Sequence, residues 1–379
     1  MIYNIFFSFA IMGVYTIMIG SILPMMRDEY GLSYEMCGSI VSAHNIGNMV
    51  AGIFAGAIAM ILSVKTAYII FTAITAVGFA LTLFTGNPVF LLCAFLLAGI
   101  GRGGCNNYIN LAISVTAEGR SAPNNLLHCC FSTGALLAPF IVLLCTKQSE
   151  KGWRTVVIFV VVLLAVSLIL SSRMDVSRIE YGQEGKNVNK TFAFLKDMRF
   201  ALPMICLFMY QCIESSMMGW LVSYFVESGY VSESFSQILN SILWASILVG
   251  CIVCVAIANK ISTPELIKVL SIGLLAFTVV LLVSDSFALA IVATIGIGLS
   301  ASGLCGTIIA CSGEVFAEYA YAMSGLIAVA GAGASLWPYI IGFVAETAGI
   351  KAGMSSILIP GVLLVIASFI NAAYFKKNR

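Results

Sequence analysis

Long apolar runs alternate with short polar breaks along almost the whole chain. About 20 consecutive apolar residues are enough for a helix to cross the hydrocarbon core of a bilayer. Twelve runs meet this criterion, and Gly, Pro, Asn or Ser residues mark many of the breaks between them. The pattern predicts an all-α polytopic membrane protein. Its expected spans are 2–25, 33–61, 66–86, 88–114, 123–146, 153–172, 200–227, 235–259, 265–284, 287–312, 320–345 and 352–375.

One long charged segment, 173–199, interrupts this pattern at the middle of the chain. It holds six Lys and Arg residues and has six predicted spans on each side. We interpret it as a cytoplasmic linker. The sequence therefore predicts an N-terminal six-helix bundle over 1–172, a linker over 173–199 and a C-terminal six-helix bundle over 200–379.

Two short stretches are similar to each other across this linker. Residues 134–142 and 333–341 share Gly, Ala, Leu, Pro and Ile in register at an offset of 199 positions. The Gly-Ile-Gly triplets 99–101 and 296–298 lie 197 positions apart. A unit present twice at about half the chain length indicates an internal repeat. We therefore expect the two bundles to be pseudo-symmetric, with Pro139 and Pro338 bending equivalent helices.

Composition excludes several classes of protein. The chain of 379 residues is 60% hydrophobic and 9% charged, whereas soluble domains carry about 25% charged residues. A net charge of +2 without a basic cluster gives no reason to expect a nucleic-acid partner. Twelve scattered Cys and two His provide no metal-ligand spacing. No nucleophile, zinc or nucleotide-binding motif occurs, so we predict neither an enzyme nor a resident cofactor.

Lys and Arg residues are distributed unequally between the two sides of the predicted spans. With the N-terminus inside, thirteen lie on the cytoplasmic side and five on the outer side. Cytoplasmic loops of membrane proteins carry the excess of positive residues. Both termini are therefore predicted to be cytoplasmic, in a plasma or inner membrane.

Six spans, a central loop and six more spans resemble the major facilitator superfamily. The stretch Gly99-Ile100-Gly101 with Asn106-Asn107-Tyr108, and the segment 313–318, resemble its sugar-transporting branches near the fucose–proton symporters. The resemblance implies a secondary transporter of alternating access, with a site at the membrane midplane. The chain departs from the family at 56–61, which lacks the usual acidic and basic residues. The predicted first and fourth spans lack the acidic residues of fucose-type symporters.

Arg102 and Glu214 are ionisable residues near the centres of predicted spans, one in each half. Each costs about 2.5–3.5 kcal/mol to place in the middle of a bilayer. A guanidinium suits a carboxylate or phosphate group, and a carboxyl group can carry a proton. We therefore predict that Arg102 binds substrate and that Glu214 couples transport to protons. The alternative is that the two residues only latch the halves together.

Other polar or aromatic residues within the spans are candidates for the same site. Asn106 and Asn110 follow Arg102 at helical spacing, so the three share one face. His128 is a candidate proton relay. For each of these residues, packing or hydrogen bonding between helices is the alternative. The remaining substrate-binding candidates are His44, Asn48, Gln211, Asn240, Trp244 and Trp337.

These observations predict a secondary active transporter that takes up a small polar solute together with protons. The resemblance implies a sugar, and Arg102 favours an anionic sugar or a carboxylate. The alternatives are a multidrug or metabolite efflux antiporter, or a transport-inactive sensor of the same fold. The expected partners are the solute, protons and the lipid bilayer, with no nucleic acid, and the protein is expected to be a monomer.

Overall fold

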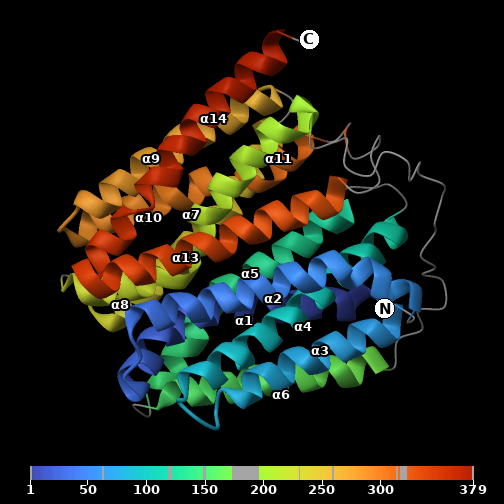
Figure 1. Ribbon diagram of the computed structural model, residues 1–379, viewed down its shortest axis with the longest axis vertical. Coiled ribbons are helices and arrows are strands. Elements are labelled where there is room, and N and C mark those ends of the chain that lie inside the picture. The colour runs from blue at the N-terminus through green and yellow to red at the C-terminus, as the bar shows by residue number, and fades with distance from the viewer. Residues whose placement is uncertain are drawn as a thin grey trace. The chain divides into compact units, whose positions relative to one another are not determined.

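The computed structural model describes residues 2–61, 64–117, 122–147, 151–172, 196–229, 231–257, 260–312, 315 and 322–377. All regular secondary structure in these ranges is helical. The chain forms two compact units, Met1–Gly182 and Gln183–Arg379. We call them unit 1 and unit 2 and describe each by itself (Figure 1). Most of the predicted linker, 173–195, lies outside the described residues.

The described residues of unit 1 form six helices whose bounds follow the apolar runs. Two boundaries differ from the prediction by five residues, because α1 ends at Tyr30 rather than at 25 and α3 ends at Leu81 rather than at 86. The end of α3 has a local cause. There the backbone N–H groups of Thr82, Leu83 and Phe84 each bond to the carbonyl three residues earlier, which tightens the chain into a turn. The helices are α1 (Ile2–Tyr30), α2 (Tyr34–Ile61), α3 (Val64–Leu81), α4 (Pro88–Ala117), α5 (Ala122–Thr146) and α6 (Gly152–Ser172).

In its described residues, unit 2 repeats this order with two differences. The predicted span 287–312 is divided in two, because the helix is interrupted at Ser302 and Gly303. The predicted gap after 345 corresponds to Gly349, whose φ of 82° breaks the helical path inside α13. The helices are α7 (Met198–Ser228), α8 (Glu233–Ile257), α9 (Thr263–Val283), α10 (Phe287–Ala301), α11 (Leu304–Cys311), α13 (Ala322–Ser355) and α14 (Leu358–Lys377).

Many of these helices have the length and composition of membrane spans. Among the described residues, nine apolar segments are long enough to cross a bilayer, and the last of them, Ala328–Lys377, runs through both α13 and α14. Lys65–Leu81 is a shorter apolar helix. Aliphatic and aromatic side chains such as Phe84, Ile169 and Val283 are exposed on the helices and turns. Lipid is the solvent that accommodates such a surface.

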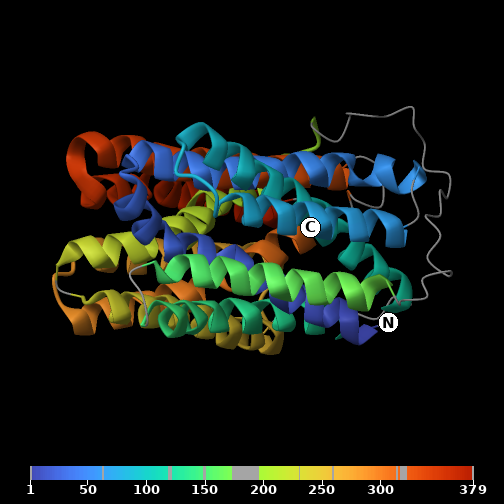
Figure 2. The same cartoon turned by 90° about the horizontal axis from the view of Figure 1, so that it is seen from below.

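The two units have the same internal packing. In unit 1, α1 packs against α5, α2 against α4, and α3 against both α4 and α6. In unit 2, α7 packs against α13, α8 against α10, and α9 against both α10 and α14. The helices of each unit run side by side in both views (Figures 1 and 2). Each span of unit 1 therefore has its counterpart six spans later in the chain, in unit 2, as the internal repeat predicts.

Glycines make the closest of these contacts, and they define the register of the repeat. A Cβ on Gly99 would collide with the carbonyl oxygen of His44, and a Cβ on Gly298 would lie 2.6 Å from that of Leu243. Gly298 follows Gly99 by 199 positions, and Leu243 follows His44 by the same number. The offset of 197 predicted for the Gly-Ile-Gly triplets is therefore replaced by 199, the offset of the Pro-containing stretches. Small residues allow two helix backbones to approach this closely.

Candidate functional site

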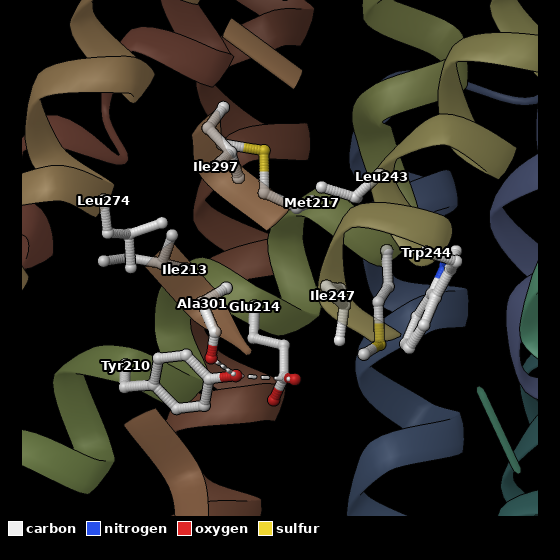
Figure 3. A pocket seen from close by; sticks show the side chains of 11 residues that line it. Tyr210, Ile213, Glu214, Met217, Leu243, Trp244, Ile247, Leu274, Ile297 and Ala301 are labelled. Atoms are coloured by element: carbon white, nitrogen blue, oxygen red, sulfur yellow. Dashed lines mark hydrogen bonds between the residues drawn. The ribbon is translucent and has the colours of Figure 1, made fainter. Parts of the chain in front are cut away.

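A pocket in unit 2 surrounds Glu214 of α7. The Tyr210 hydroxyl donates to Glu214 Oε1 at 2.8 Å, and it also lies 3.1 Å from the carbonyl oxygen of Ala301 (Figure 3). The residues around this polar pair are almost all apolar. They are Ile213, Met217, Met218, Leu243, Trp244, Ile247, Leu274 and Ile297. The carboxyl group therefore lies in a site of low polarity, where gain or loss of its charge has a large energetic effect.

Unit 1 contains a polar cluster around Arg102 of α4. Arg102 is half-buried and lies close enough to Tyr15 and His44 to interact with both electrostatically. His44 is 3% exposed. Its ring nitrogens make no hydrogen bond of ordinary geometry with the described residues, although the backbone of Phe95 is close to the ring. Below we call Tyr15, His44 and Arg102 the Arg102 cluster.

The repeat places the Arg102 cluster and the Glu214 pocket at equivalent positions. Glu214 lies 199 positions after Tyr15, and Ala301 lies 199 positions after Arg102. The lining residue Leu243 corresponds in the same way to His44. Each unit thus has one site on its first, second and fourth helices. The site of unit 1 carries a cation and an imidazole, and that of unit 2 carries a carboxyl group among apolar side chains.

Four of the predicted binding residues lie in unit 2. Trp244 lines the Glu214 pocket, and Asn240, one turn earlier in α8, is 1% exposed. Gln211 is half-buried beside Gly333 at the contact of α7 with α13. Trp337 is partly buried and donates its indole N–H to Ser356 Oγ at 3.2 Å. The structure therefore brings Trp244 together with Glu214, and it gives Trp337 a local hydrogen-bonding role.

The other predicted residues belong to unit 1. Asn48 and Asn106 are half-buried, and the backbone carbonyl of Asn48 faces Gly103 of α4. Gly103 of α4 therefore meets α2 at Asn48. The side chains of Asn110 and His128 lie outside the described part of the chain.

Sequence reasoning missed two tyrosines that belong to these sites. Tyr210 precedes Glu214 by one helical turn, the spacing at which side chains meet. Tyr15 is the repeat counterpart of Glu214 at the offset of 199. Both could have been found by applying helical spacing and the repeat offset to the ionisable residue already identified.

The profile of the Major Facilitator Superfamily matches residues 5–316. The chain belongs to this superfamily. Its fold is also similar to solved structures of low sequence identity. The nucleoside transporter NupG is 17% identical, with a TM-score of 0.76 over 99% of this chain and 98% of that one. A D-xylose-proton symporter is 14% identical, with a TM-score of 0.79 over 98% and 96% of the two chains.

A third structure is a variant of the E. coli fucose:proton symporter FucP, 15% identical with a TM-score of 0.66 over 98% of each chain. No curated protein matches the sequence. Superfamily membership confirms the resemblance, the all-α fold, and the prediction of a transporter rather than an enzyme. The protein is a multi-pass membrane transporter of a small solute.

Proposed function

We propose that this superfamily member takes up a small polar solute together with protons, by alternating access. The observation that supports this is the setting of Glu214, a carboxyl group hydrogen-bonded to Tyr210 within an apolar pocket. In such a pocket the protonated and ionised forms of the carboxyl group differ strongly in free energy, so binding or release of a proton has a large effect. Two of the similar structures, FucP and the D-xylose-proton symporter, are proton symporters.

We propose that the Arg102 cluster recognises the solute. The guanidinium presents several donors in a rigid plane, which matches carboxylate oxygens. The imidazole of His44 adds a buried polar group nearby. Among the proteins of similar structure, NupG is a nucleoside transporter and another is a D-xylose-proton symporter. An anionic sugar or a carboxylate is therefore the proposed solute class, and a neutral sugar is the competing one.

The test is uptake by proteoliposomes under an imposed pH gradient. Wild-type protein should accumulate radiolabelled solute when the outside is acidic, and Glu214→Gln should abolish this accumulation. The matched control is Glu227→Gln, because Glu227 lies on the same helix and is exposed. Unchanged pH-driven uptake by Glu214→Gln would refute the proton-coupling role. Accumulation of solute only when the pH gradient is reversed would instead identify an efflux antiporter. Absence of solute flux under both gradients would identify a transport-inactive sensor.

We further propose that the protein is a monomer of the plasma or inner membrane with both termini in the cytoplasm. The excess of Lys and Arg on one side of the spans supports this orientation. Protease protection of terminal tags in sealed vesicles tests it, and light scattering of the purified protein tests the oligomeric state.

A further inference from the structure

The helix formed by α10 and α11 is interrupted at a point held by neighbouring helices of unit 2. α10 ends at Ala301, and α11 begins at Leu304. A Cβ on Gly303 would collide with Cys254 Sγ of α8. Gly250 of α8 likewise faces Ser302 Oγ. The interruption is thus packed tightly against α8.

Two backbone carbonyls at the interruption accept hydrogen bonds from side chains of other helices. The Ala301 carbonyl accepts from the Tyr210 hydroxyl of α7 at 3.1 Å. The Ser302 carbonyl accepts from the Cys251 thiol of α8 at 3.2 Å. A carbonyl group that is shielded from water and lacks a hydrogen-bond partner is destabilising. These two donors therefore stabilise the interrupted form relative to a continuous helix.

Unit 1 provides an internal comparison. Gly103 and Gly104 lie 199 positions before Ser302 and Gly303, yet α4 runs unbroken through them. Glycine is a weaker helix former than serine. Local sequence therefore favours a break in α4, where there is none.

The donors account for this difference. Ile11 is found 199 positions before Tyr210, and Gly52 is found 199 positions before Cys251. Neither side chain can donate a hydrogen bond. In unit 1 the carbonyl of Gly103, the counterpart of Ser302, accepts from Asn107 Nδ2 of its own helix at 2.8 Å. In unit 2 the two carbonyls at the interruption accept from Tyr210 and Cys251 on neighbouring helices.

The Tyr210 hydroxyl has one proton and two acceptors. Its oxygen lies 2.8 Å from Glu214 Oε1 and 3.1 Å from the Ala301 carbonyl oxygen. An ionised carboxylate is the stronger acceptor and takes the larger share of this proton. A protonated carboxyl group can instead donate to the phenol oxygen, which leaves the phenol proton to Ala301.

We propose that protonation of Glu214 controls the α10–α11 interruption, with Tyr210 as the positioning residue between them. The proposal rests on the proposed function in taking Glu214 as the proton site. Protonation strengthens the bond from Tyr210 to Ala301 and stabilises the interrupted helix. Deprotonation weakens that bond and favours the continuous one. The proton thereby changes the shape of a helix that lines the same pocket.

Two thiols in the described part of the chain lie near Glu214 and Tyr210. Cys305 of α11 acts on Glu214 electrostatically, and Cys251 of α8 acts on Tyr210. From α9 and α10 the pocket receives the apolar Leu274 and Ile297. Towards α13, the neighbouring Ser215 donates to the Ala334 carbonyl.

Hydrogen–deuterium exchange of the full-length protein in nanodiscs tests the proposal. Peptides covering 303–306 are followed at about pH 5.5 and about pH 8, with labelling times scaled for intrinsic exchange. Wild-type protein should show about threefold faster corrected exchange at the lower pH, because the interrupted form leaves amides unprotected. Tyr210→Phe and Glu214→Gln should each bring this ratio to about one.

The matched control is Tyr224→Phe. Tyr224 is also buried on α7, and its hydroxyl donates to the Leu281 carbonyl at 3.2 Å. The Tyr224→Phe variant should retain the wild-type ratio of exchange rates at the two pH values. A ratio near one in the wild type, or a retained ratio in Tyr210→Phe, would overturn the proposal. If Tyr210→Phe fails to fold, a retained ratio in Glu214→Gln overturns it equally.

The two proposals can fail separately. Loss of proton-driven uptake in Glu214→Gln, with pH-independent exchange in the wild type, would leave the proposed function standing and refute the helix switch. Normal uptake by Glu214→Gln would refute the proposed function. The exchange ratio of that variant would then show whether the helix still responds to Glu214.

Discussion

Gly134 of α5 lies directly against the carbonyl oxygen of Ala10 in α1, so that one added methyl group would strike the backbone of the neighbouring helix. In unit 2, Gly333 of α13 meets α7 in the same way, with a Cβ position 2.5 Å from the carbonyl oxygen of Phe208. The first and fifth helices of each unit therefore approach each other through a glycine at the same place in the repeat.

Gly134→Ala should accordingly destabilise the protein by about 1–3 kcal/mol, because rigid backbone must move to admit the methyl group. The measurement is thermal unfolding in detergent. Gly306→Ala is the control, since a Cβ there meets nothing within 4 Å. Equal melting temperatures for the two variants would contradict the interpretation of this contact.

Ser215→Ala should destabilise unit 2 by about 1–3 kcal/mol. Pro338 has no N–H to bond to the Ala334 carbonyl one turn earlier, and Ser215 Oγ donates to that carbonyl at 2.8 Å. The adjacent Ser216 bonds only within its own helix, to the Cys212 carbonyl, so Ser216→Ala should cost much less. Comparable losses in a denaturation series would argue against this role.

Arg154→Ala should lower stability by about 1.5–3 kcal/mol. Its guanidinium donates to Glu29 Oε1 at 2.8 Å and to the Tyr30 hydroxyl at 3.0 Å, so it joins α6 to the end of α1. Lys351 pairs with Asp285 at 3.2 Å, but both side chains are more than half exposed. Lys351→Ala should therefore change stability by less than about 1 kcal/mol, a difference that thermal unfolding at two salt concentrations would detect.

Asp197 stabilises the start of α7 in a pH-dependent way. Its hydrogen bonds with Arg199 hold the pKa of the carboxyl group below its ordinary value of 3.8. A depressed pKa means that the stabilisation is complete above pH 3.8 and is lost as the pH falls further.

Asp197→Ala should therefore cost about 0.5–2 kcal/mol near neutral pH and progressively less below about pH 4. Ser286 precedes α10 without a capping hydrogen bond, so Ser286→Ala should have little effect at any pH. Unfolding measured across this pH range checks both expectations, and a pH-independent cost for Asp197→Ala would refute the ionic contribution.

Arg102→Lys should weaken binding of an acidic solute by about 10- to 100-fold, because an ammonium group cannot reproduce the planar fork of the guanidinium. Binding of a neutral sugar should change little. Isothermal titration with a matched acidic and neutral sugar measures both. Equal losses for the two ligands would favour the alternative in which Arg102 only holds the structure together.

The apolar runs predicted most of the fold because a bilayer demands long, internally hydrogen-bonded helices. The observed bounds of α1 to α9 follow the predicted spans, with the later end of α1 and the earlier end of α3 as the main differences. The repeated Pro-containing stretches also gave the offset of 199 that relates the two units. Mid-span ionisable residues identified Arg102 and Glu214 as candidates, since charge within a span is costly.

The sequence by itself thus determined the helices, their repetition and the two ionisable residues within the spans, Arg102 and Glu214. Only the tertiary structure decided where the tenth predicted span is interrupted, because the donors that satisfy its carbonyls come from Tyr210 and Cys251 on other helices. It also decided that Glu214 shares a hydroxyl with the Ala301 backbone. Such contacts join residues that are far apart in the chain, and a local sequence pattern does not predict which of these residues come into contact.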